Sequence, residues 1–211
     1  MSSPPSSALP QPFPDPVGVK TDISLIEAHL GSHGKIVVED IRFQDMLRTK
    51  GFGENEDSEY ILKPYEGLYL LYAKQIIFKN KRETSFDLLF EILLKYDRNI
   101  MTKFLIYRDL RSRGYIVKEG FGFGNDFRVY ERGEYEKKPA KYVIFGINEG
   151  TNTTTKNFAN AIEQIEKMGK EAVIAVIERR GEVIYYKVSK MRFADNNNKY
   201  LAKNNELEDK Y

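Results

Sequence analysis

The chain has 211 residues, 41% of them apolar and 13% aromatic, which is enough to bury a hydrophobic core in one or two domains. Its formal net charge of only +2 excludes a strongly basic nucleic-acid-binding tail, so any contact with RNA must come from a local patch. The sequence has no cysteine, which excludes disulfides and cysteine metal sites. It also has no apolar run approaching about 18 residues and no N-terminal signal region. We therefore expect a cytoplasmic protein without a membrane partner.

The first 98 residues divide into two parts. Residues 1–19 are rich in proline and serine, which predicts a disordered leader. Residues 20–98 alternate short apolar runs with turns and predict a small α/β domain. One of its helices should cover residues 64–72, because a proline suits the first helical turn. Another should follow Thr84 or Ser85, either of which can cap it, with an apolar stripe of Leu88, Leu89, Ile92, Leu93 and Tyr96.

The second half of the chain, residues 99–190, should begin with a helix that has a basic polar face. The inward positions of this helix are apolar: Ile100, Phe104, Leu105 and Leu110. Its polar side carries three arginines, with a lysine close behind them: Arg108, Arg111, Arg113 and Lys118. These cations are suited to contact an RNA phosphate backbone, although a charged helix face is more often simply solvated.

The rest of this half predicts a mixed sheet with one further helix. Strands are expected over residues 115–118, 126–130 and 142–147, and a hairpin of two more over 172–177 and 183–188. The helix should start near Thr153–Thr155 and end at Gly169, with Phe158, Ile162, Ile165 and Met168 inward. The glycine run at 120–124 indicates a tight turn, because a strand and not a helix follows it. Residues 191–211 form a polar tail.

Two side chains stand where a strand begins or ends. Tyr130 ends a strand beside a polar loop, so its hydroxyl should be reachable. Lys170 follows the predicted helix end and precedes a strand, which places it to project into a cleft. Spacing alone gives neither of them a catalytic role.

Two long segments carry a resemblance to a known family. The first comprises YRDLRSRGYIVK, which begins at Tyr107, and GFGNDFRVYERG, which ends at Gly133. The second is KEAVIAVIERRGEVIYY, which begins at Lys170. They resemble the archaeal tRNA-splicing endonucleases, and the likeness extends over roughly residues 60–190. It implies an α/β (α+β) fold, with a small mixed N-terminal domain and a C-terminal domain like the mixed-sheet catalytic domain of the tRNA-intron endonucleases.

The resemblance implies a chemistry that needs no metal and no cofactor. A tyrosine helps remove the 2′-OH proton, a histidine is the general acid and a lysine stabilises the transition state, leaving 2′,3′-cyclic phosphate and 5′-OH ends. Tyr130 and Lys170 stand at the tyrosine and lysine positions, but Pro139 stands at the histidine position. The two histidines of the chain, His29 and His33, lie elsewhere. The resemblance therefore points to a structural, non-catalytic subunit.

The same resemblance implies partners and surfaces. In the α2β2 form of the enzyme such a subunit assembles with a catalytic subunit and a second copy of itself, and the substrate is precursor tRNA with a bulge-helix-bulge motif. The strand 183–188, with Val183 and Tyr185, is expected to pair with its counterpart edge to edge. A family docking loop corresponds to four charged residues, Glu178, Arg179, Arg180 and Glu182, and an ordinary solvated hairpin is the alternative. Glu163 stands where the family has an arginine that binds the intron bulge.

Two other functions remain open from the sequence. The chain can be an active endonuclease that uses Tyr130 and Lys170 with another acid. It can also be an RNA-binding protein without any link to cleavage, for which the arginine-rich helix is the motivation.

Overall fold

The computed structural model describes residues 25–79, 84–122, 126–148 and 155–191. The described part contains five α-helices and two mixed five-stranded sheets, which confirms the predicted α+β fold. The leader at 1–19, the tail from 192 and part of the glycine run at 120–124 lie outside the described residues. The longest helices among the described residues have 13 residues, and none of the helices there is long and apolar enough to cross a membrane.

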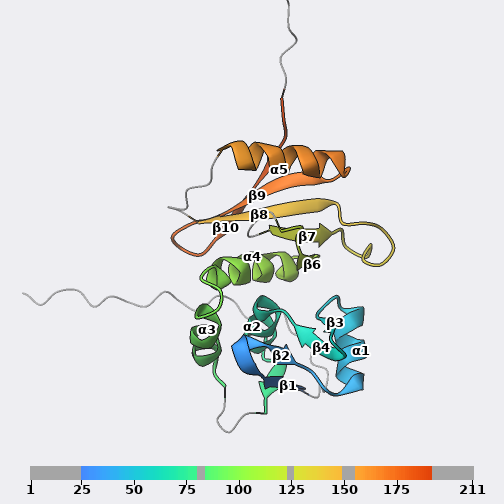
Figure 1. Ribbon diagram of the computed structural model, residues 1–211, viewed down its shortest axis with the longest axis vertical. Coiled ribbons are helices and arrows are strands. Elements are labelled where there is room, and N and C mark those ends of the chain that lie inside the picture. Colours follow the sequence, from blue (N-terminus) through green and yellow to red (C-terminus); the bar gives the residue numbers. More distant parts are fainter. Residues whose placement is uncertain (1–24, 80–83, 123–125, 149–154, 192–211) are drawn as a thin grey trace, which may run out of the picture.

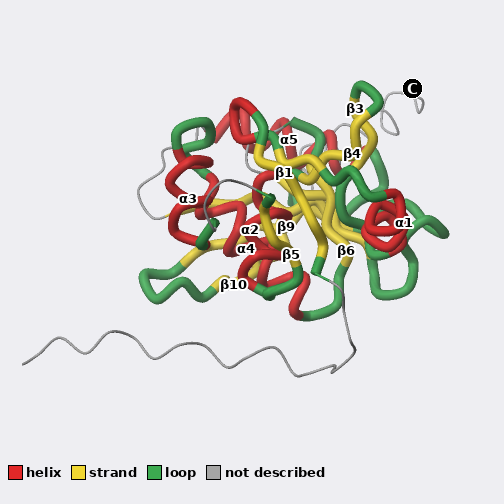
Figure 2. The backbone as a smooth tube through the Cα atoms, turned by 90° about the horizontal axis from the view of Figure 1, so that it is seen from below, coloured by secondary structure: helices red, strands yellow, loops and turns green. Residues whose placement is uncertain are grey.

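The N-terminal half builds a sheet with the strand order β3-β4-β2-β1-β5, in which β1 and β5 are parallel and the other pairs are antiparallel. Its elements are β1 (Ile26–Leu30), η1 (Ser32–Gly34), β2 (Ile36–Val37), α1 (Ile41–Thr49), β3 (Glu54–Glu56), β4 (Glu59–Leu62), α2 (Pro64–Tyr72), β5 (Ile76–Phe78) and α3 (Phe86–Leu94). Figure 2 shows α1 and α3 on opposite sides of the strands of this sheet.

Both helices expected in the N-terminal half are present. Helix α2 covers the predicted residues with proline first, and α3 is capped by Ser85, whose Oγ accepts a hydrogen bond from the Leu88 N–H at 3.2 Å. The expected apolar stripe of α3 is wrong at two positions. Leu88 is 40% exposed and Tyr96 is 56% exposed, because Leu88 lies outside the buried face of Leu89 and Leu93, and α3 ends before Tyr96.

The C-terminal half builds the second sheet, with the strand order β10-β9-β8-β7-β6. Strands β8 and β9 are parallel and joined through a helix, whereas the other neighbours are antiparallel. The elements are α4 (Ile100–Ser112), β6 (Ile116–Glu119), β7 (Asp126–Tyr130), β8 (Tyr142–Asn148), α5 (Thr155–Lys167), β9 (Glu171–Ile177) and β10 (Val183–Val188). Met168, expected inside, is 40% exposed because α5 ends one residue before it.

The helices separate the two sheets into layers (Figure 1). Helix α5 covers one face of the C-terminal sheet and α4 covers the other, while the far side of α4 packs on α2 and α3. One cluster of buried side chains accordingly runs from the N-terminal sheet through α4 into β6–β9, and a smaller one lies under α5. The two halves therefore share a core, with α4 at its centre.

Candidate functional site

The topology of the C-terminal sheet brings three strand ends together. Strand β7 ends at Tyr130, and its neighbour β8 begins at Tyr142, which pairs with Val129. Because β9 runs parallel to β8, with Tyr142 opposite Glu171, β9 begins at the same end of the sheet. Lys170, directly before β9, thus reaches the region where β7 ends.

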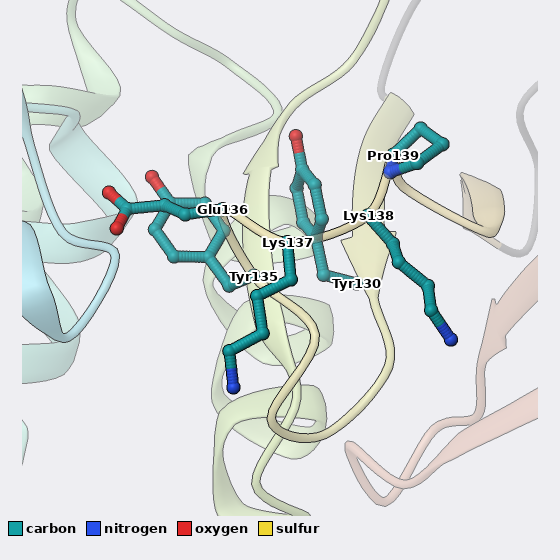
Figure 3. A pocket seen from close by; sticks show the side chains of 6 residues that line it. All are labelled: Tyr130, Tyr135, Glu136, Lys137, Lys138 and Pro139. Carbon is teal, nitrogen blue, oxygen red and sulfur yellow. The ribbon is translucent and has the colours of Figure 1, made fainter.

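An open hollow lies at this end of the sheet (Figure 3). It has a volume of about 450 Å³ and is lined by Tyr130, Tyr135, Glu136, Lys137, Lys138 and Pro139. The Tyr130 ring stands in the middle with Pro139 beside it, whereas the Lys137 and Lys138 side chains point away from the tyrosine hydroxyl. Two of the residues singled out from the sequence thus border one space.

Lys170 approaches the same segment from the neighbouring strand. Its Nζ donates a hydrogen bond to the Ala140 carbonyl at 3.0 Å, one residue beyond Pro139. The structure therefore places Tyr130, Pro139 and Lys170 around one stretch of chain, although their chemical roles stay a prediction.

The lysines of the 131–141 connection are largely paired with carboxylates. Lys138 Nζ lies 2.6 Å from Glu134, and Lys141 contacts Glu131, which also accepts a hydrogen bond from the Tyr142 hydroxyl at 3.3 Å. Hydrogen bonding to these carboxylates raises the pKa of both lysines above the usual lysine value, and the Lys141 ammonium lowers the pKa of Glu131. These lysines hold their protons more tightly than free lysines do.

The described part of the chain places no imidazole at the hollow. His29 lies on β1 with its Nε2 3.4 Å from Glu39, and His33 lies in η1 with its ring 5.8 Å from that of Tyr96. Nor does it contain a group of three His, Asp or Glu side chains that is placed to hold a metal ion.

Two of the four cations expected to bind RNA face the N-terminal half instead. Arg111 lies 4.0 Å over the Phe52 ring and donates to the Lys50 carbonyl at 3.0 Å. Lys118 donates to the Gly53 carbonyl at 2.8 Å, and burial lowers its pKa. These side chains tie α4 and β6 to the loop at 50–53.

The other two cations also have partners on the protein. Arg113 is paired with Asp109 at 2.8 Å, and Arg108 lies over the rings of Tyr72 and Phe104. The four side chains do not form one exposed patch, so RNA binding by this group stays a prediction.

A buried carboxylate lies where α4 and β6 contact the loop at 50–53, and the sequence analysis did not identify it. Glu66 on α2 is 1% exposed, and its Oε2 accepts hydrogen bonds from the N–H groups of Gly53 at 3.0 Å and Lys63 at 2.9 Å. Burial raises its pKa, and the charges of Lys118 and Arg111 oppose that rise. An acidic residue in the third position of α2 is the usual sign of a capping box, but that pattern does not reveal burial.

Strand β10 is an edge strand with one apolar side left uncovered. Val183 and Tyr185 face the main core, where the Tyr185 hydroxyl donates to Asp109 at 2.8 Å. The alternate residues Ile184 and Tyr186 point to the other face and are 36% and 53% exposed. Ile184 and Tyr186 were also missed in the sequence, and the two-residue alternation of a strand could have identified them.

The charged residues next to β10 lie at the surface. Glu178, Arg179, Arg180 and Glu182 form an exposed turn that is closed by a hydrogen bond from the Glu178 N–H to the Glu182 carbonyl at 3.0 Å. Glu163 on α5 pairs with Lys167 and Lys190, which lower its pKa to about 2. It remains ionised near neutral pH, so it cannot replace a cationic RNA contact.

Comparison with known proteins yields two family models that together span most of the chain. One is described as "tRNA intron endonuclease, N-terminal domain" and matches residues 24–90, and the other as "tRNA intron endonuclease, catalytic C-terminal domain" and matches residues 100–185. The chain is 31% identical over 163 residues to the tRNA-splicing endonuclease of Methanococcus maripaludis, covering 76% of this chain and 92% of that protein. It is 34% identical over 149 residues to that of Thermococcus onnurineus, covering 70% and 86%.

Proposed function

Because this chain belongs to the tRNA intron endonuclease family, we propose that it is a structural subunit of a tRNA-splicing endonuclease, which removes introns from precursor tRNA at bulge-helix-bulge motifs. The observation that carries the proposal is Pro139, which borders the hollow beside Tyr130 and precedes the carbonyl that Lys170 contacts. A proline side chain has no proton to donate. Cleavage that leaves 2′,3′-cyclic phosphate and 5′-OH ends then depends on a partner with the histidine.

The lysines near Pro139 support a non-catalytic role. A general acid works best with a pKa near the operating pH, whereas a free lysine has a pKa of about 10.4. The carboxylates beside Lys138 and Lys141 raise the pKa of these lysines further. Neither lysine is suited to replace the missing histidine.

The free side of β10 supports a role in assembly. An edge strand presents unpaired backbone groups, and here the adjacent Ile184 and Tyr186 side chains add exposed apolar surface. We assign this edge to the contact with a second endonuclease subunit. The complete assembly would be an α2β2 tetramer of two such chains and two catalytic subunits.

A cleavage assay tests the proposal. The purified chain is incubated with a bulge-helix-bulge RNA alone and together with a family member that carries the histidine. We expect no cleavage by this chain alone and cleavage by the mixture, beyond any produced by the partner alone. Cleavage by the chain alone at the rate of the mixture would overturn the proposal.

A second function is favoured by the retained Tyr130 and Lys170, which still lie around the same segment. An active endonuclease with a different acid would need both side chains. In that case Tyr130→Phe and Lys170→Ala in this chain abolish cleavage by the assembled enzyme, whereas a structural subunit tolerates both changes.

A further inference from the structure

Tyr135 lies at the site but was not singled out in the sequence. It belongs to the connection between β7 and β8, and its ring meets the Tyr130 ring edge to face, with the centroids 5.1 Å apart and an interplanar angle of 88°. The next residue, Glu136, has φ +65°, in the left-handed region that a glutamate rarely adopts. Backbone of this kind persists where surrounding contacts hold it.

The opposite side of Tyr135 lies against the N-terminal half. A Cβ placed on Gly51 would lie 3.5 Å from Tyr135 Cε1, so this ring is next to the Gly51 backbone. In Figure 3 the Tyr135 and Glu136 side chains point toward the blue ribbon of the N-terminal half. Tyr135 thus lies between Tyr130 and a loop that is distant in sequence.

That loop is held firmly at its backbone. The Lys50 carbonyl accepts from Arg111 and the Gly53 carbonyl accepts from Lys118, while the Gly53 N–H donates to the buried Glu66. The loop between Lys50 and Gly53 is therefore fixed to α2, α4 and β6, and it offers Tyr135 a rigid support.

We propose that Tyr135 is a positioning residue, which rests on Gly51 and fixes the orientation of the Tyr130 ring in the hollow. An edge-to-face pair of this kind biases the ring orientation by roughly 2- to 10-fold. The N-terminal half thereby takes part in the geometry of the site. The importance of this orientation for RNA rests on the second proposed function, an active endonuclease, which needs the Tyr130 side chain at the position of the family's tyrosine.

NMR of the full chain with ¹³C-labelled tyrosine tests the positioning role. Tyr130→Phe assigns the Tyr130 signal by its loss. We expect Tyr135→Ala to shift that signal and to accelerate amide exchange in the connection to β8 by roughly 2- to 10-fold, whereas Tyr135→Phe keeps the ring and leaves both close to wild type. The wild-type chain should also show a nuclear Overhauser effect between the Tyr135 ring and the Gly51 α-protons.

A matched control is available at another aromatic pair of the chain. Tyr72 packs edge to face on Phe104, with centroids 6.0 Å apart, so Tyr72→Ala removes a similar ring pair and should leave the Tyr130 signal unchanged. The proposal is overturned if Tyr135→Ala leaves the Tyr130 signal and exchange rates as in wild type, or if the Gly51 contact is absent. Should Tyr135→Ala fail to fold, Tyr135→Leu fills the space without an aromatic ring and is judged by the same two outcomes.

The experiment separates this inference from the proposed function. The NMR signals are measured without RNA or a partner, and they alone decide whether Tyr135 positions Tyr130. The assembly and cleavage assay decides whether the chain is an endonuclease subunit. The NMR experiment can therefore contradict the positioning role without affecting the proposed function, and the cleavage assay can contradict the proposed function without affecting the positioning role.

Discussion

Pro139 is the residue of the candidate site at which the resemblance predicts that a reacting group, the histidine, is missing. Pro139 borders the hollow beside Tyr130, and Lys170 reaches the carbonyl of the next residue. We predict that Pro139→His makes the chain cleave bulge-helix-bulge RNA without a partner, because an imidazole can donate a proton near neutral pH. General acid catalysis typically contributes about 10²–10⁴-fold, so a rise of at least about 100-fold over wild type is expected in single-turnover assays.

Two controls belong to this substitution. Pro139→Ala removes the proline ring without adding an acid and should remain inactive. Tyr130→Phe combined with Pro139→His should lose the gained activity. If Pro139→His cleaves no faster than Pro139→Ala, the hollow lacks the geometry for catalysis and the missing histidine does not explain inactivity.

Glu66 links the stability of the fold to pH. Burial raises its pKa above 4.5, so the folded chain binds this proton more tightly than the unfolded chain. Its stabilising contribution is therefore complete below pH 4.5 and is lost as the pH rises through the folded pKa. We predict that Glu66→Gln, which keeps an oxygen for the Gly53 and Lys63 N–H groups, removes this part of the pH dependence.

Urea unfolding at about pH 4.5 and about pH 7.5 measures the effect. When the pH is raised from about 4.5 to about 7.5, the free energy of unfolding should fall less in the variant than in wild type. Lys118 is the cation whose charge acts most strongly on Glu66, and burial lowers its own pKa. Equal pH dependence in the two proteins would contradict the prediction.

At the scale of elements, local patterns predicted much of the fold. Proline in the first turn placed α2, a cap at Thr84 or Ser85 placed the start of α3, and the alternation over 126–130 and 183–188 placed β7 and β10. These signals act within a few residues. The exposed sides of α3 and the partners of Arg111 and Lys118 depend on contacts between the two halves of the chain, which periodicity does not reveal.

The candidate site was likewise predicted where the signal is local and missed where it depends on contacts between distant parts of the chain. Tyr130 and Lys170 were singled out by their position at strand ends, and the order of the strands brings both to the same end of the sheet. Tyr135 was missed because its contacts, the Tyr130 ring and Gly51, arise from the path of the connection and from a loop of the N-terminal half. A single sequence gives no local signal for such a contact.

The edge strand β10 yields a prediction about assembly. Tyr186 is 53% exposed on the uncovered side, so Tyr186→Glu should not disturb the fold of the subunit. Burying an unpaired carboxylate in an interface is costly, and we expect at least about a tenfold weaker association with the other endonuclease subunit. Sedimentation velocity with the purified partner measures this. Tyr96→Glu, at a site 56% exposed in the N-terminal half, is the matched control and should associate like wild type.

At the scale of the whole molecule, the described residues form two sheets but one main core. Helix α4 packs on the C-terminal sheet with one side and on α2 and α3 with the other. One family model ends at residue 90 and the other begins at residue 100, where α4 starts, yet the buried side chains continue from one half to the other. We therefore expect the halves to unfold together.

Tyr107 on α4 tests this expectation, since its ring lies 5.0 Å from Tyr65 in one half and 6.4 Å from Phe127 in the other. Tyr107→Ala should lower the free energy of unfolding by about 3–5 kcal/mol, as large aromatic truncations do. Native-state hydrogen exchange should show the same loss of protection in β1 and in β9. Loss confined to one sheet would contradict a shared core.

The Tyr107 hydroxyl provides the control for that substitution. It is buried, and among the described residues it has no hydrogen-bond partner. Tyr107→Phe removes only this group and should change stability by less than about 1 kcal/mol or increase it, because an unsatisfied buried hydroxyl is itself unfavourable. Destabilisation by Tyr107→Phe as large as that by Tyr107→Ala would mean that the hydroxyl, and not the ring, joins the two halves.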